Sequence, residues 1–74
     1  MSTEALLFRK ALSDVLTAEE HVIEQLADLE YVRSLYGPHD ARRKQVEFAY
    51  TSAMLVHKHA LCVARDLLAK HPAP

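Results

Sequence analysis

The sequence has few of the residues that stop helices or cross-link chains. Its 74 residues include one glycine, three prolines, one cysteine and no tryptophan, and asparagine is absent. Folds made of β-strands need many turn residues, whereas leucine, alanine and glutamate favour long helices. Because Cys62 has no second cysteine to pair with, an intrachain disulfide is excluded. The composition therefore predicts a single all-α domain over residues 1–74.

A long apolar run and a basic leader are also missing. No uncharged stretch approaches the ~18 residues that a membrane span needs. The first four residues, Met1 to Glu4, contain no basic residue of the kind that opens a secretion signal. A chain with one cysteine also suits a reducing compartment. We therefore expect a cytoplasmic protein without a membrane anchor.

The charged residues nearly cancel, but they are unevenly distributed. The formal net charge of −1 argues against a nucleic-acid binder driven by overall charge. Up to Gly37 the chain carries three basic and seven acidic residues, and from Pro38 onwards it carries six basic and three acidic ones. An acidic half and a basic half attract each other. This distribution favours a fold in which the two halves lie side by side.

One segment interrupts the helical pattern near the middle of the chain. From Tyr36 to Asp40 the sequence reads Tyr-Gly-Pro-His-Asp. Glycine can take the left-handed conformation of a helix cap, and proline cannot continue the preceding helix. We therefore predict a first helix over about 3–36, a turn over 36–40 and a second helix over about 40–70.

Both predicted helices are amphipathic, with apolar residues at spacings of three and four. In the first helix these residues are Ala5, Phe8, Leu12, Val15, Leu16, Val22, Ile23, Leu26 and Leu29. In the second they are Val46, Ala49, Tyr50, Ala53, Val56, Ala60, Leu61, Ala64, Leu67 and Leu68. The pattern predicts an antiparallel two-helix hairpin. Residues 17–20 match a capping box, so a restart of the first helix there is an alternative.

The second helix carries a further apolar row at intervals of seven residues, away from its main face. This row is Phe48, Leu55, Cys62 and Ala69. A two-helix hairpin cannot cover both faces, and an exposed apolar row on a small protein marks an interface. We therefore predict that the hairpin completes a four-helix bundle or a larger helical assembly. Self-association as a homodimer and binding to a different protein both remain open.

Two polar residues stand where apolar ones are expected. Glu19 interrupts the apolar face of the first helix and His57 that of the second, and the position of the turn places them opposite each other. We predict a buried polar pair that fixes the helix register. A metal site built from two hairpins is a weaker alternative, because four-helix carboxylate sites use Glu-x-x-His and neither Glu19 nor Glu20 has that partner. No metal or cofactor is predicted.

A basic cluster, Arg42-Arg43-Lys44, opens the second helix. We expect it to form ion pairs with acidic residues near the turn, such as Glu30. As a nucleic-acid signal it is one short run without a second patch. Catalysis is not indicated, because the chain lacks a phosphate-binding glycine loop and its lone thiol lies on an apolar row.

The layout resembles the small helical-hairpin co-chaperones of type III secretion needle subunits. The resemblance is architectural: a first helix of similar length, a turn at 36–40, a second helix that opens with Gln45-Val46, and a close at Asp66-Leu67-Leu68. It implies that the hairpin binds a tetratricopeptide-type chaperone and helps to keep a needle protein soluble.

The expected function is therefore that of a small, non-enzymatic protein-interaction module, adaptor or chaperone subunit. The alternative is a homodimeric four-helix bundle that binds nucleic acid, similar to plasmid copy-control proteins, whose basic and aromatic outer face this chain lacks. A bundle that binds metal through Glu19 and His57 is a further alternative.

Overall fold

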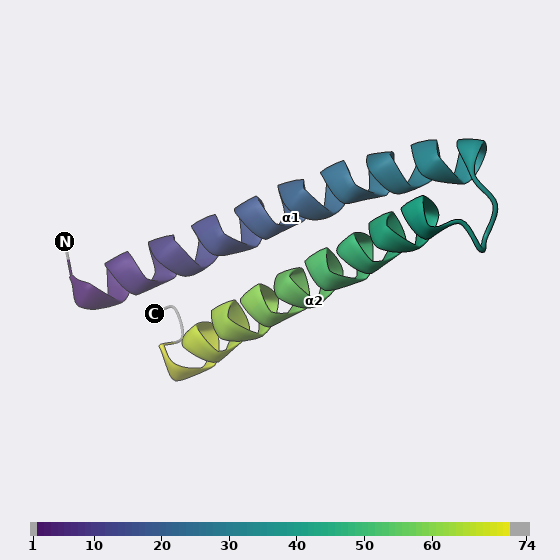
Figure 1. The fold of residues 1–74 in the computed structure, drawn as a ribbon. Coiled ribbons are helices and arrows are strands. Elements are labelled where there is room, and N and C mark those ends of the chain that lie inside the picture. Colours follow the sequence, from purple (N-terminus) through teal and green to yellow (C-terminus); the bar gives the residue numbers. More distant parts are fainter. Residues whose placement is uncertain (1, 72–74) are drawn as a thin grey trace.

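The protein is an antiparallel hairpin of two long helices. The computed structural model describes residues 2–71, which form α1 (Thr3–Leu35) and α2 (Ala41–Lys70) and contain no β-strand. The helices lie side by side along a rod of 52 × 17 × 15 Å (Figure 1). The all-α hairpin predicted from the sequence is confirmed.

Each helix begins at a side chain that caps its free backbone N–H groups. The Ser2 hydroxyl accepts a hydrogen bond from the Ala5 N–H at 3.2 Å, and the Asp40 carboxylate accepts one from the Arg42 N–H at 2.8 Å. Between these caps α1 runs unbroken through the run that starts at Thr17. The alternative of a restart there is wrong, because nothing in that run breaks the helix.

The turn uses proline rather than a left-handed glycine. No glycine or other residue in the described chain has a positive φ, so the predicted left-handed cap at Gly37 is wrong. Proline disfavours a helical conformation of the residue before it, which is Gly37 here. One residue earlier, Tyr36 already has extended backbone angles. The Asp40 N–H donates to the Gly37 carbonyl at 3.1 Å. The chain thus reverses through a tight turn with Pro38 at its second position.

Side chains on both sides of the turn hold it closed. The Arg42 guanidinium donates to both oxygens of Asp40, at 3.1 and 2.9 Å, and lies 3.8 Å from the centre of the Tyr36 ring. Arg43 donates to the Tyr36 carbonyl at 3.3 Å and to Glu47 at 2.9 Å. These contacts fix the direction in which α2 leaves the turn.

A narrow seam built on alanine joins the helices. In α1 the buried side chains are Ala11, Ala18 and Leu29, and in α2 they are Ala53 and Ala60. Half-buried side chains extend this seam, including Phe8, Val15, Val22, Val32, Val46, Tyr50, His57, Ala64 and Leu67. The spacing of three and four along both helices is that of a coiled coil. The alanine side chains let the two backbones approach closely.

The narrow seam leaves the outer half of the predicted α1 face uncovered. Leu12, Leu16 and Ile23 are all exposed, whereas the sequence predicted that they pack on α2. On α2 the same correction applies to Val56 and Leu68. The physical reason is the small size of alanine: residues a quarter turn away from such a seam lie beyond the reach of the other helix.

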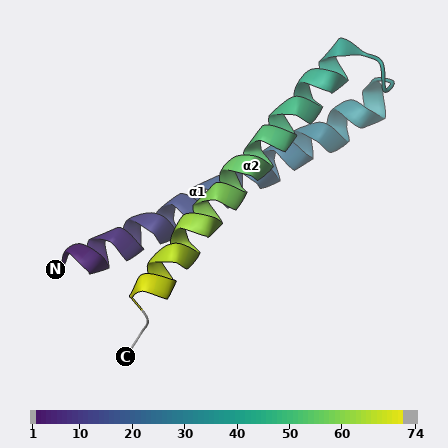
Figure 2. The same ribbon diagram turned by 90° about the horizontal axis from the view of Figure 1, so that it is seen from below.

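The two ends of the seam fix its register. At the turn end the Arg33 guanidinium lies 4.0 Å from the Glu47 carboxylate. At the open end Phe8 and His71 pack edge to face, with ring centres 6.1 Å apart, and His71 also lies 3.3 Å from Glu4. Figure 2 shows that the helices cross between these ends rather than running strictly parallel.

The hairpin exposes far more surface than a compact chain of its size. Its surface area is 5791 Å², whereas a compact protein of 8.4 kDa exposes about 4,600 Å². Its radius of gyration is 16.6 Å, against about 11 Å for a compact chain of this length. In the described part of the chain, fourteen large hydrophobic side chains are exposed and Leu29 is the only large one that is buried.

Candidate functional site

The sequence-predicted row on α2 lies on the surface. Phe48 is 75% exposed and Leu55 is 62% exposed. Cys62 and Ala69 follow on the same side of the helix and are also exposed. We call these four residues the outer row. None of them belongs to the seam, as the spacing of seven residues away from the main face predicted.

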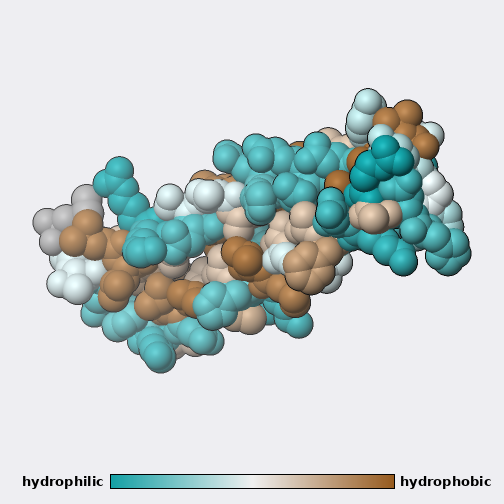
Figure 3. Space-filling model, viewed as in Figure 1, coloured by the Kyte–Doolittle hydropathy of each residue, from teal (hydrophilic) through white to brown (hydrophobic). Residues whose placement is uncertain are grey.

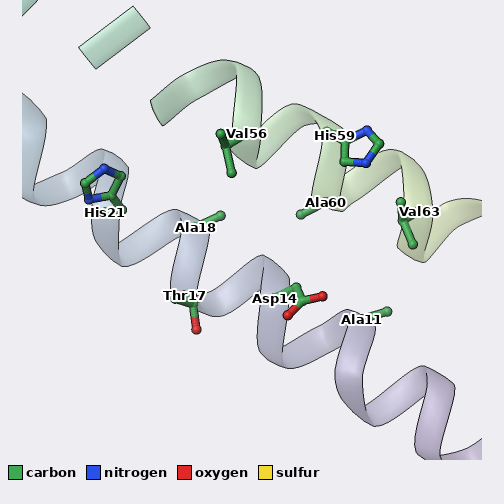
Figure 4. Close-up of a pocket in the computed structure, with 9 residues that line it drawn as sticks. All are labelled: Ala11, Asp14, Thr17, Ala18, His21, Val56, His59, Ala60 and Val63. Atoms are coloured by element: carbon green, nitrogen blue, oxygen red, sulfur yellow. The ribbon is translucent and has the colours of Figure 1, made fainter. Parts of the chain in front are cut away.

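A groove runs between the helices along one flank of the seam, whereas the outer row lies on the side of α2 that faces away from α1. The volume of the groove is about 450 Å³, and its floor includes Ala18 and Ala60, which point toward each other across the seam (Figure 4). The complete lining consists of Ala11, Asp14, Thr17, Ala18, His21, Val56, His59, Ala60 and Val63. Three alanines of the seam, Ala11, Ala18 and Ala60, lie between the two walls of the groove.

The two walls of the groove differ chemically. The α1 wall is polar and carries Asp14 and His21, and Glu24 and Asp28 follow on the same side of the helix. The α2 wall carries Val56 and Val63, together with His59. In Figure 3 hydrophilic side chains line the upper edge over α1, and hydrophobic ones gather toward α2 around a hollow between the helices. We call this side of the hairpin the groove face.

The opposite side of the hairpin is apolar on both helices, and sequence reasoning missed it as a separate surface. The flank of α1 opposite the groove carries Leu12, Leu16, Ile23 and Leu26, and that of α2 carries Met54, Leu61 and Leu68. All of these except the half-buried Leu61 are exposed. We call these seven residues the leucine face. The signal that could have separated it is the heptad spacing of the small residues, which marks the seam and leaves the leucines outside it.

The predicted buried pair of Glu19 and His57 is not found. Glu19 is exposed among the residues of the leucine face, while His57 is half-buried in the seam. No polar or charged side chain in the described chain is buried, and these two residues share none of its hydrogen bonds or ion pairs. The reason is again the seam, because Ala18 rather than Glu19 is the α1 residue that faces α2.

The basic cluster is largely engaged within the turn. Arg42 is paired with Asp40 and Arg43 with Glu47, at 2.9 Å in both cases. Lys44 is exposed one residue further along α2. The predicted ion pairs therefore exist, but their acidic partners lie in the turn and in α2 rather than at Glu30. Two of the three cations are already neutralised by neighbouring carboxylates.

The strongest perturbation of a titratable group occurs at the same place. The pKa of Asp40 is lowered from its usual value of 3.8, first because the Arg42 side chain donates hydrogen bonds to its carboxylate and then because the Arg42 backbone N–H does so. The same bonds raise the pKa of Arg42. Arg42 is exposed, Asp40 is half-buried, and both hold the turn, so this perturbation belongs to the structure of the hairpin rather than to a reactive centre.

Metal-site and membrane signatures are not found in the part of the chain that the structure describes. Within residues 2–71 no group of three or more histidine, cysteine or acidic side chains is placed to hold a metal ion. Neither α1 nor α2 contains an apolar stretch long enough to cross a membrane.

Comparisons of the chain with protein-family models, with curated proteins and with solved structures found no match.

Proposed function

We propose that the chain is a non-enzymatic protein-interaction module that binds another protein through its groove face and its outer row. The observation that carries this proposal is the incomplete core: five buried side chains, four of them alanine, beside fourteen exposed large hydrophobic ones in the described chain. Exposed apolar surface of this extent marks an interface. The outer row is part of that surface, on the side of α2 that faces away from α1.

The chemistry of the groove face indicates the kind of helix that fits it. One wall offers apolar contacts from Val56 and Val63, and the other wall offers the carboxylate of Asp14. An amphipathic helix binds such a surface with an apolar stripe over α2 and basic residues over α1. The hairpin then supplies two helices of a three-helix contact, and the partner supplies the third.

The resemblance to needle-subunit co-chaperones suggests a class of partner for this module. A tetratricopeptide-type chaperone consists of helix pairs, and a needle subunit has an apolar surface that needs cover before assembly. Either one fits a surface that binds helices. Within this proposal the chain acts as an adaptor or chaperone subunit, and its outer row contributes the energy of binding through burial of Phe48 and Leu55.

Site-specific photo-crosslinking in the source cells tests this function. A photoreactive phenylalanine analogue replaces Phe48 in one variant and Glu20, an exposed residue on the far side of α1, in the matched control. We expect a discrete adduct with another protein from position 48, absent from position 20 and lost when Leu55→Asp is added. Mass spectrometry then identifies the partner. Adducts only with the chain itself, or equal adducts from both positions, would contradict the proposal.

A further inference from the structure

The leucine face differs from the groove face in being apolar on both helices. Leu12, Leu16 and Ile23 project from α1 on this side, and Met54 and Leu68 project from α2. A surface with the same chemistry on both of its helices is self-complementary, because any helix laid on it meets apolar side chains. The groove face lacks this property, since its polar wall would face the apolar wall of a second copy.

We propose that the leucine face packs against the leucine face of a second copy of this chain, so that two hairpins form a four-helix bundle with α1 of each copy against α2 of the other. This inference is independent of the partner proposed for the groove face, which stays open on the outside of the bundle.

The exposed area matches what such a dimer needs. The hairpin exposes 5791 Å², about 1,200 Å² more than a compact chain of its mass. If each of two copies buries that excess, the interface covers about 2,400 Å², which lies in the range of obligate homodimers. A rod of 52 Å provides one continuous contact line for this area. The surplus surface of the hairpin is thus accounted for by a single second copy.

The charges of the two helices select the arrangement. α1 carries seven acidic and three basic residues, whereas α2 carries two acidic and six basic ones. A bundle that places α1 against α1 of the second copy brings two negative helices together. With α1 against α2 of the second copy, every neighbouring pair of helices has opposite charge, which favours that arrangement. The two-fold axis then runs parallel to the rod.

Glu19, which lies between Leu16 and Ile23 of the leucine face, fits the same arrangement. The contacts of Arg33 with Glu47 and of Phe8 with His71 set a register in which Glu19 lies at the level of Lys58 to Leu61. Rotation about an axis parallel to the rod leaves every residue at the same height along the rod, so the second copy has the same register. Glu19 of one copy therefore comes close to Lys58 at the edge of α2 of the other, while Leu16 meets Leu61 and Ile23 meets Met54.

A matched pair of leucine variants tests the face. Leu16 on the leucine face is 61% exposed and Leu55 in the outer row is 62% exposed, so Leu16→Asp and Leu55→Asp are the same change at equal exposure, one inside the leucine face and one outside it. Light scattering across dilution measures the mass of each variant, and circular dichroism measures its helicity. We expect the wild type and Leu55→Asp to be dimers and Leu16→Asp to dissociate at about 100-fold higher concentration.

Two results would overturn this assignment. One is a wild-type chain that remains a single helical chain at all concentrations, and the other is equal dissociation of the two aspartate variants. Neither result bears on the partner of the groove face, because the adduct from position 48 is scored separately. Conversely, if position 48 gives no adduct but the chain is a dimer, the proposed function is contradicted and the proposed dimer is supported.

A charge exchange tests the arrangement of the helices. Glu19→Lys places a lysine opposite Lys58 of the second copy, so we expect weaker dimerisation, about 10-fold in dissociation constant. Adding Lys58→Glu should restore the wild-type value. In a bundle with α1 against α1, Glu19 faces its own symmetry mate, and Lys58→Glu would bring no rescue.

Discussion

The guanidinium of Arg42 lies 3.8 Å above the centre of the Tyr36 ring and pairs at the same time with the carboxylate of Asp40. These three side chains join the end of α1 to the start of α2. A long hairpin depends on such a lock, because a small change in the angle between its helices moves their far ends by many ångströms. The turn thus helps to set the register of the seam, together with the contacts at the two ends of the seam.

The ion pair in this lock predicts a pH dependence. The lowered pKa of Asp40 means that folding favours the charged carboxylate. The stabilisation is therefore fully present above the usual pKa of 3.8 and disappears as the pH falls through the lowered value. We expect Asp40→Asn, which keeps a capping side chain, to lower the melting temperature at neutral pH but not in strong acid. Equal melting temperatures of the two proteins at neutral pH would contradict this role.

The alanine seam predicts that larger side chains are not tolerated. Ala18→Leu and Ala60→Leu each place three extra carbon atoms at a buried position of the seam. We expect each change to reduce the free energy of unfolding by about 1–3 kcal/mol. Ala27 is exposed on the outer side of α1, so Ala27→Leu serves as the control and should stay within about 0.5 kcal/mol of the wild type. Denaturant unfolding followed by circular dichroism measures all three.

Leu29 is the only large side chain that is buried in the described part of the hairpin. We expect Leu29→Ala to lower the free energy of unfolding by about 2–5 kcal/mol, because the lost contacts leave a cavity beside the seam. The same change at Leu35, near the end of α1, removes a side chain that is more than half exposed and should cost much less. A similar loss for both variants in denaturant unfolding would show that the seam is not the stabilising contact near the turn.

The thiol of Cys62 reports on which face is covered. It is exposed in the outer row, on the side of α2 that faces away from α1 and outside the leucine face. We therefore expect iodoacetamide to alkylate Cys62 at the same rate in dilute and in concentrated solutions of the chain. Protection should appear only when a partner covers the outer row. Protection that increases with concentration of the chain alone would place the outer row inside the self-association interface instead.

Much of the fold followed from the sequence because its signals are local. The break near Gly37-Pro38 and the apolar spacing gave two helices whose observed ends lie close to the predicted ones. The rotation of each helix was harder to predict, since leucine contributes more to an apolar pattern than alanine does. In α1 this bias drew attention to Leu12 and Leu16, although Ala11 and Ala18 form the contact.

The candidate site was predictable to a similar extent. The outer row was visible as a surplus of apolar residues on α2, and the structure places Phe48 and Leu55 on the surface. The leucine face was not recognised, because its residues were counted as core. The pairing of Glu19 with His57 depended on that same rotation, and an error of one residue in the seam moved Glu19 from the interior to the surface.

The most direct measurement of the incomplete core is the thermal unfolding of the chain as a function of its concentration, followed by circular dichroism. A core completed by a second copy predicts a cooperative transition whose midpoint falls by roughly 10 °C over a thousandfold dilution. A cooperative transition with a midpoint that does not change on dilution would show that one hairpin is stable alone, and would contradict the claim that its exposed leucine face needs a second copy.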